Sequence, residues 1–204
     1  MPRDKIESHK RVMRAAMTEF LKHGYEGTSM REIGERAGMT TAGLYRHCTS
    51  KADLFDELVA PALSAMRDWY DRHKLCGYMH IDVGVDKGEL FNGSMIDFAM
   101  ELIYRYNDEF QLLFKKADGT KYANFVHHII CVEQRDFMEA LHYMHDKGMN
   151  VKLVSDAELH VMMSAYTTAL LEPFMHDMPK DEAEKCLKTI EEFFMPGWQR
   201  IMGY

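Results

Sequence analysis

Apolar residues recur at helical spacing along almost the whole chain. Between Lys5 and His23 they follow one face of a helix, and Gly24 stands where a C-terminal stop is expected. The alternation of apolar and polar residues between turn dipeptides, which marks strands, is missing. The pattern therefore predicts an all-α protein.

The residues after this first helix have the pattern of a second helix, a tight turn and a third helix. Ser29 and Glu32 form a capping box, in which the serine hydroxyl and the glutamate carboxylate each bind an amide of the first turn. Gly38 follows where the chain must turn sharply, and Thr40 or Thr41 caps the next short helix. Two short helices joined by a glycine turn indicate a helix-turn-helix.

The rest of the chain also shows helical patterns, interrupted by glycines and prolines. A fourth helix is expected from Thr49 to about Lys74, with a kink or boundary near Pro61, followed by a loop or broken helix over Leu75–Gly93. The last pattern is expected to break at Phe194–Trp198. The other predicted helices cover about 94–107, 108–117, 121–147, 156–178 and 180–195.

Charge is distributed unevenly. The net charge is −7, but the first fifty residues hold nine basic and six acidic side chains, which leaves the remainder strongly acidic. Such a distribution permits a DNA-facing N-terminal region and an acidic body that avoids DNA.

Other features of the composition indicate a cytoplasmic protein. The start of the chain lacks the pattern of a secretory signal, and no stretch approaches the roughly 18 apolar residues of a membrane span. The four cysteines are scattered, so reduced thiols are expected rather than disulfides or a zinc ribbon. We expect no membrane partner.

The run from Thr28 to Leu54 resembles the DNA-binding signature of the TetR family of bacterial regulators. It keeps Ala37-Gly38, Leu44-Tyr45 and Ser50-Lys51 at the family spacing. Cys48 departs from the pattern, because the family usually has phenylalanine there, so the packing under the recognition helix is expected to differ.

The resemblance implies a domain organisation and a function. Residues 1–50 would form the helix-turn-helix DNA-binding domain, and residues 51–204 a helical ligand-sensing and dimerisation domain. The protein would be a homodimer, paired through the helices near 156–178 and 180–195, with recognition helices ~34 Å apart on a pseudo-palindromic operator. It would be a regulator, most simply a repressor released from double-stranded operator DNA by a small-molecule effector.

The resemblance also assigns roles to residues. Thr28, Tyr45 and Lys51 would hold DNA phosphates, while small residues at the start of the recognition helix would let its backbone approach base edges. Arg46 and His47 would reach a phosphate or a groove edge. The full predicted DNA-binding set is Thr28, Arg31, Thr40, Thr41, Ala42, Gly43, Tyr45, Arg46, His47 and Lys51.

Candidate ligand-binding residues are aromatic or polar residues on the central helices. Some form a helical stripe that is more typical of a core than of a pocket, and for Arg135 an ion pair with Glu139 at i+4 is favoured over contact with an anionic ligand. The candidates are Phe98, Leu102, Tyr106, Phe110, Phe125, His128, Cys131, Arg135 and Tyr166.

Two other classes of function are open to test. A metal- or haem-responsive regulator would use His127, His128 and Cys131, or His142 and His145. Enzyme activity is not expected, since no phosphate-binding glycine loop, GxSxG or HExxH motif is present and the Glu191-Glu192 pair is expected on a solvated helix face. We therefore expect no catalytic residues, no cofactor and no dedicated metal site.

Overall fold

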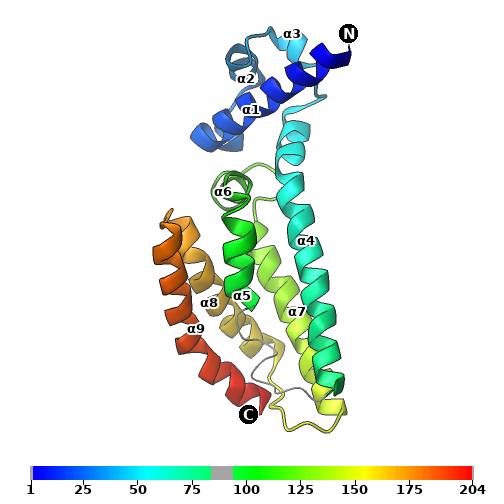
Figure 1. Cartoon of the computed structure of the whole chain (residues 1–204), viewed down its shortest axis with the longest axis vertical. Coiled ribbons are helices and arrows are strands. Elements are labelled where there is room, and N and C mark those ends of the chain that lie inside the picture. Colours follow the sequence, from blue (N-terminus) through cyan, green and yellow to red (C-terminus); the bar gives the residue numbers. More distant parts are fainter. Residues whose placement is uncertain (1, 84–93, 204) are drawn as a thin grey trace. The chain divides into compact units, whose positions relative to one another are not determined.

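The computed structural model describes residues 2–83 and 94–203. These residues form helices joined by turns, with no strand among them (Figure 1). The prediction of an all-α fold is confirmed. No helix in these two ranges is long and apolar enough to cross a membrane.

Contacts divide the chain into two compact units. The first contains Met1–Ala65 and Tyr106–Phe125, and the second contains Met66–Arg105 and Val126–Tyr204. The packing thus assigns residues 106–125 to the unit of the N-terminal helices, which no local sequence pattern indicated. The functional boundary after residue 50 stays a prediction.

The first unit is built from α1 (Pro2–Gly27), α2 (Met30–Arg36), α3 (Thr41–Leu44), the start of α4 (Lys51–Val83) and α6 (Asn107–Lys115). Gly24, with φ of 73°, ends the regular part of α1 where the sequence predicted a stop. The next amide, of Tyr25, donates to the carbonyl of Lys116 at 3.0 Å. Fully buried Phe20, Ile33, Leu44 and Phe55 belong to the core of this unit.

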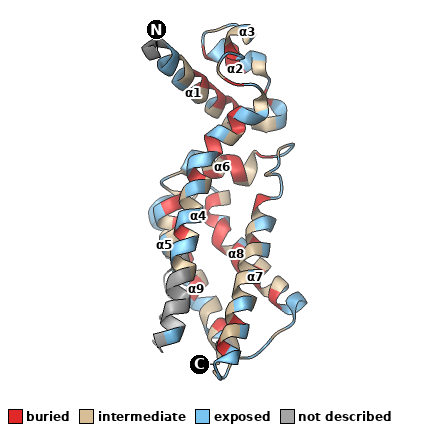
Figure 2. Cartoon of the chain, turned by 90° about the vertical axis from the view of Figure 1, so that its right-hand side faces the viewer, coloured by how far each residue is buried: buried red, intermediate tan, exposed pale blue. Residues whose placement is uncertain are grey.

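The second unit contains the rest of α4 together with α5 (Ser94–Phe98), a π-helix η1 (Ala99–Ile103), α7 (Phe125–Asp146), α8 (Asp156–Met175) and α9 (Lys180–Met202). Helices α8 and α9 lie side by side (Figure 1). Buried positions run along α8 (Figure 2), among them Leu159, Met163 and Leu170. Leu187 of α9 is buried as well.

The helix boundaries predicted at two prolines are wrong, while the kink that was the alternative at Pro61 stays a prediction. Helix α4 continues through Pro61, and α9 continues through Pro196 to Met202 instead of breaking at 194–198. A proline removes one backbone donor and frees the carbonyl four residues earlier. Both prolines are exposed, as are Glu57 and Glu192, which carry the freed carbonyls, so water can satisfy them.

The predicted loop over Leu75–Gly93 is wrong in its first part, because α4 remains helical to Val83. Residues 84–93 lie outside the described residues. The predicted helix at 94–107 is divided into α5 and η1, followed by a turn at 104–106.

Two glycine substitutions should have opposite effects on stability. Gly38 has φ of 68°, a backbone conformation that is strained for any residue with a Cβ, whereas Gly197 lies within helix α9. A Cβ at either position meets nothing within 4 Å. We expect Gly38→Ala to lower the free energy of unfolding by about 1 kcal/mol. Gly197→Ala should raise it by up to about 1 kcal/mol, since alanine favours helix. Urea unfolding at equal protein concentration measures both changes. If both variants were stabilised, or both destabilised, the different backbone conformations given to the two glycines would be contradicted.

Candidate nucleic-acid interface

The helix-turn-helix is held by local hydrogen bonds and a close backbone approach. In the capping box of α2, the Ser29 amide donates to the Glu32 carboxylate at 2.8 Å, and the Glu32 amide donates to the Ser29 hydroxyl at 3.3 Å. Thr40 caps α3 by accepting from the Gly43 amide at 3.1 Å. A Cβ at Gly34 would lie 3.2 Å from the carbonyl oxygen of Met39, so glycine allows α2 to approach the turn.

Helix α3 presents its predicted recognition residues to solvent. Leu44 points into the core with no exposed surface, while Thr40, Ala42 and Arg46 are exposed and Tyr45 is 51% exposed. Thr41, Gly43 and His47 are partly exposed. The surface that would enter a DNA groove is therefore accessible within its own unit.

Basic groups surround the end of this surface. The pKa of His47 is lowered, first by burial of its ring and then by the positive charges of His9, Lys5, Arg11 and Arg46. The Nδ1 atom of His47 is buried and has no hydrogen-bond partner among the described residues. Positive potential at this end of the unit favours a polyanion. The sequence reasoning missed Lys5 and Arg11 as contributors.

Two predicted phosphate ligands are engaged within the chain. The Thr28 side chain is buried, and its hydroxyl donates to the carbonyl of Gly24 at 2.7 Å. The Lys51 ammonium donates to the carbonyls of Tyr25 and Thr28 at 2.7 and 2.8 Å, and lies 4.3 Å from the Tyr25 ring centroid. Burial lowers the pKa of Lys51. These contacts stabilise the junction of α1, α2 and α4, while their phosphate roles stay predictions.

An ion pair between buried Glu19 and exposed Arg36, which the sequence did not reveal, joins α1 to α2. Glu19 is buried, and its carboxylate accepts from the guanidinium of Arg36. His23 lies 3.7 Å from the same carboxylate. Arg31, a predicted DNA ligand, pairs with Glu35 at 2.8 Å on the exposed side of α2. Arg36 thus has a structural role, and Arg31 remains at the surface.

Cys48 is buried beneath α3. Its Sγ lies 3.7 Å from the carbonyl oxygen of Leu44, and burial raises the pKa of the thiol. The side chain thus occupies the core position where the family usually has a larger aromatic ring.

The nine ligand-binding candidates do not fall in a single unit. Tyr106, Phe110 and Phe125 belong to the first unit and the other six to the second. Phe110, Phe125, Leu102 and Tyr166 are buried, and Phe98 packs against Trp69 with ring centroids 4.8 Å apart. His128, Cys131 and Arg135 are exposed on α7. Their ligand role stays a prediction.

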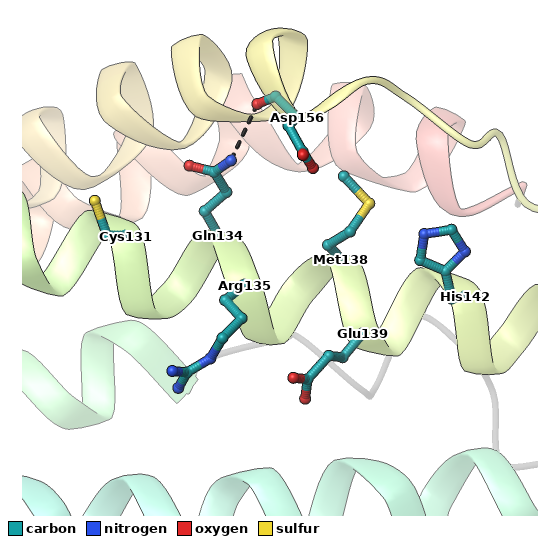
Figure 3. A pocket seen from close by; sticks show the side chains of 7 residues that line it. All are labelled: Cys131, Gln134, Arg135, Met138, Glu139, His142 and Asp156. Carbon is teal, nitrogen blue, oxygen red and sulfur yellow. Dashed lines mark hydrogen bonds between the residues drawn. The ribbon is translucent and has the colours of Figure 1, made fainter.

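A surface hollow of about 360 Å³ lies along α7 (Figure 3). Gln134 donates to the carbonyl of Asp156 at 3.0 Å at its edge. Arg135 pairs with Asp136 at 3.2 Å, and Glu139 pairs with Lys74, so the predicted Arg135–Glu139 ion pair is wrong. The lining residues are Cys131, Gln134, Arg135, Met138, Glu139, His142 and Asp156.

The metal alternative finds no support. Within residues 2–83 and 94–203, no group of three or more histidine, cysteine or acidic side chains is arranged to hold a metal ion. His127 and Cys131 approach to 3.6 Å, but His128, His142 and His145 are exposed.

The prediction that Glu191 is solvated is wrong, because it is only 8% exposed. Its neighbours on the buried side of α9 are Ala183, Leu187 and Trp198, at helical spacings of four and seven residues. That spacing could have revealed its inward direction, since Glu191 lies on the apolar stripe. The adjacent Glu192 is exposed, as predicted.

Comparison with known proteins finds a family match in the N-terminal part of the chain. Residues 12–58 match the family "Bacterial regulatory proteins, tetR family". The HTH-type transcriptional regulator YdgC of Bacillus subtilis (strain 168) is 28% identical over 104 residues, which cover 51% of this chain and 49% of YdgC. The HTH-type transcriptional activator FasR of Mycolicibacterium smegmatis is 33% identical over 82 residues, covering 36% of each chain. The chain thus matches about half the length of YdgC and a smaller share of FasR.

A solved structure extends the similarity in fold to most of the chain. The SmeT–triclosan complex superposes with a TM-score of 0.55 at 18% identity, covering 91% of this chain and 90% of that one. The family match lies on the helix-turn-helix described above, and the fold of the remainder is also shared. The match to the TetR family is thus shown for residues 12–58.

Substituting Lys51 should lower stability. In Lys51→Ala the carbonyls of Tyr25 and Thr28 lose a charged donor, so we expect the free energy of unfolding to fall by about 1–3 kcal/mol. Lys22→Ala, on the exposed side of α1, is the control and should change it by less than about 0.5 kcal/mol. Denaturant unfolding measures both, and equal effects would remove the structural role of Lys51.

Proposed function

We propose that this protein is a ligand-responsive transcriptional regulator that binds a pseudo-palindromic operator as a homodimer. The observation that carries the proposal is the exposed α3 surface, with Thr40, Ala42, Tyr45 and Arg46 accessible beside a positive end of the first unit. The match of residues 12–58 to a family of bacterial regulatory proteins supports the same function.

Pairing of two subunits is proposed through α8 and α9. These helices pack against each other, and each carries a large apolar side chain in solvent: Val161 of α8 is 67% exposed and Phe193 of α9 is 78% exposed. Exposed apolar side chains on packed helices fit a second copy of the same surface related by two-fold symmetry. A dimer is also what a palindromic operator requires.

Repression with release by a small molecule is the mechanism we propose. A ligand that favours a conformation with a different spacing of the two recognition helices lowers operator affinity. The operator must then lower ligand affinity by the same factor, because linkage is reciprocal. SmeT is known in complex with triclosan, which supports a small-molecule effector for this fold.

Placing a carboxylate on the recognition surface tests the DNA contact. Ala42→Glu should reduce affinity for an operator by at least about a hundredfold, since the added charge would face phosphates and base edges. The operator is first selected from a random duplex library with the intact protein, and affinity is measured by fluorescence anisotropy. Ala60→Glu, at an exposed position of α4, is the matched control and should bind as the parent does.

The two variants also define failure. If the library selection yields no enriched duplex, or if Ala42→Glu binds as tightly as Ala60→Glu, the DNA-binding proposal is overturned. A thermal unfolding curve for each variant shows that it is folded, which is expected since both alanines are exposed.

Breaking the proposed subunit interface should yield monomers. Phe193→Glu introduces a charge into a surface that a partner would bury, so sedimentation velocity should show a monomer where the parent is a dimer. Operator affinity should fall with it, since one recognition helix alone makes half the contacts. The control is Leu153→Glu, at an exposed apolar residue outside α8 and α9, which should remain dimeric. A dimeric Phe193→Glu protein would exclude this interface.

A further inference from the structure

The second unit encloses two carboxyl groups among aromatic rings where α7, α8 and α9 contribute inward side chains. Tyr166 is central: its ring centroid lies 5.2 Å from that of Phe194 and 5.9 Å from that of Trp198, and Phe137 lies 5.2 Å from Trp198. We call the set the acid-aromatic cluster: Glu133, Phe137, Tyr166, Glu191, Phe194 and Trp198.

Both carboxyl groups approach the Tyr166 phenol. The pKa of Tyr166 is raised, first by burial and then by the negative charges of Glu191 and Glu133. Glu133 of α7 accepts from Thr167, the residue next to Tyr166 on α8, while Glu191 lies on α9, so carboxyl groups from two helices act on one phenol. The two acids thus belong to a single site in the core.

Glu191 and Trp198 each have a buried polar atom without a partner. Glu191 is 8% exposed; it accepts a hydrogen bond from the backbone of Ile96, but its Oε1 has no partner among the described residues. Trp198 is 6% exposed, and its Nε1–H likewise has no acceptor there. Buried polar atoms are nearly always hydrogen-bonded, so two unsatisfied atoms in one cluster point to a ligand that satisfies them.

No cation among the residues that the structure describes compensates the two acids. Glu133 accepts from the Thr167 hydroxyl at 2.8 Å, and burial raises the pKa of its carboxyl group to about 7. Burial and the negative charge of Asp97 raise the pKa of Glu191. Among the described residues, no lysine, arginine or histidine contributes to either shift. A buried carboxylate that carries its charge is stabilised by a positive partner, and the described residues supply none.

We propose that the acid-aromatic cluster binds an organic cation with an apolar body, whose ammonium group contacts Glu191 and Glu133 while its apolar part packs against the rings of Tyr166, Phe194 and Trp198. This inference rests on the proposed regulator function, because it names the chemical class of its effector. Aromatic faces attract cations, and desolvated sites strengthen that attraction. An organic cation also fits better than a metal ion, since no metal-binding group is found in the described chain.

Three ligands of equal chain length test the charge of the site. Decylammonium, decanol and decanoate share an apolar tail and differ in the head group. Isothermal titration of the full-length protein should show decylammonium binding at least about tenfold more tightly than either of the others, corresponding to a cation bound beside buried carboxylates. Equal or tighter binding of decanoate or decanol overturns the proposal.

Substitutions then assign the binding to the cluster. Glu191→Gln keeps the shape and removes the charge, so it should reduce decylammonium affinity by at least about tenfold. Glu192→Gln, one residue along the same helix but exposed, is the matched control and should leave affinity unchanged. Since Glu191→Gln removes an uncompensated buried charge, its thermal midpoint should not fall. Unchanged affinity in Glu191→Gln overturns the site.

Proton release provides a second measurement that depends on Glu133. A bound cation favours its charged form, so decylammonium binding should release protons near pH 7, and affinity should rise from pH 6 to pH 8. Titration in buffers of different ionisation enthalpy detects the protons. Glu133→Gln should abolish this release, and persistence of the release would overturn the role of Glu133.

Operator binding by the ligand-free protein is measured in parallel. Binding of operator without binding of decylammonium refutes only the effector class. Binding of decylammonium without operator binding refutes the regulator function and leaves the cation site standing.

Discussion

The close approach between α2 and the turn before α3 is the constraint on which the recognition surface depends. A Cβ at Gly34 would lie 3.2 Å from the Met39 carbonyl oxygen, and Gly38 takes a positive φ in the same turn. With the chain held there, Thr40 can cap α3 and Leu44 can enter the core. Because one side of so short a helix is fixed by Leu44, the other side must face solvent. The exposure of this side of α3 thus follows from backbone packing.

Local signals explain why the helix-turn-helix could be predicted. The capping box, the glycine turn and the threonine cap each act within four residues, so their sequence pattern contains the geometry. The boundaries predicted at Pro61 and Pro196 were wrong, because the free energy that a proline costs a helix depends on whether the freed carbonyl reaches water. That depends on tertiary exposure, which a local pattern does not contain. The same limit applies to the inclusion of residues 106–125 in the first unit.

The α3 surface could be predicted from the sequence and the acid-aromatic cluster could not, because only the first depends on residues that are neighbours in sequence. The α3 residues lie next to one another in sequence, so a short motif defines their surface. Glu133, Tyr166 and Glu191 come from three helices, and only the fold brings them to one phenol. A charged pair such as Glu191-Glu192 ordinarily indicates a solvated face, but the helical stripe through Leu187 and Trp198 assigns its two members to opposite environments. Charge alone was therefore the wrong guide to burial.

The same uncompensated acids limit how an effector could act on DNA affinity. A ligand shifts a conformational equilibrium only by the difference in its affinity for the two conformations. A cation gains most where Glu133 and Glu191 are enclosed, since attraction between charges strengthens as water is excluded. A conformation that opens the cluster to water would lose much of that gain. Sensitivity to an effector would then depend on how tightly Tyr166 and its aromatic neighbours close around the two carboxyl groups.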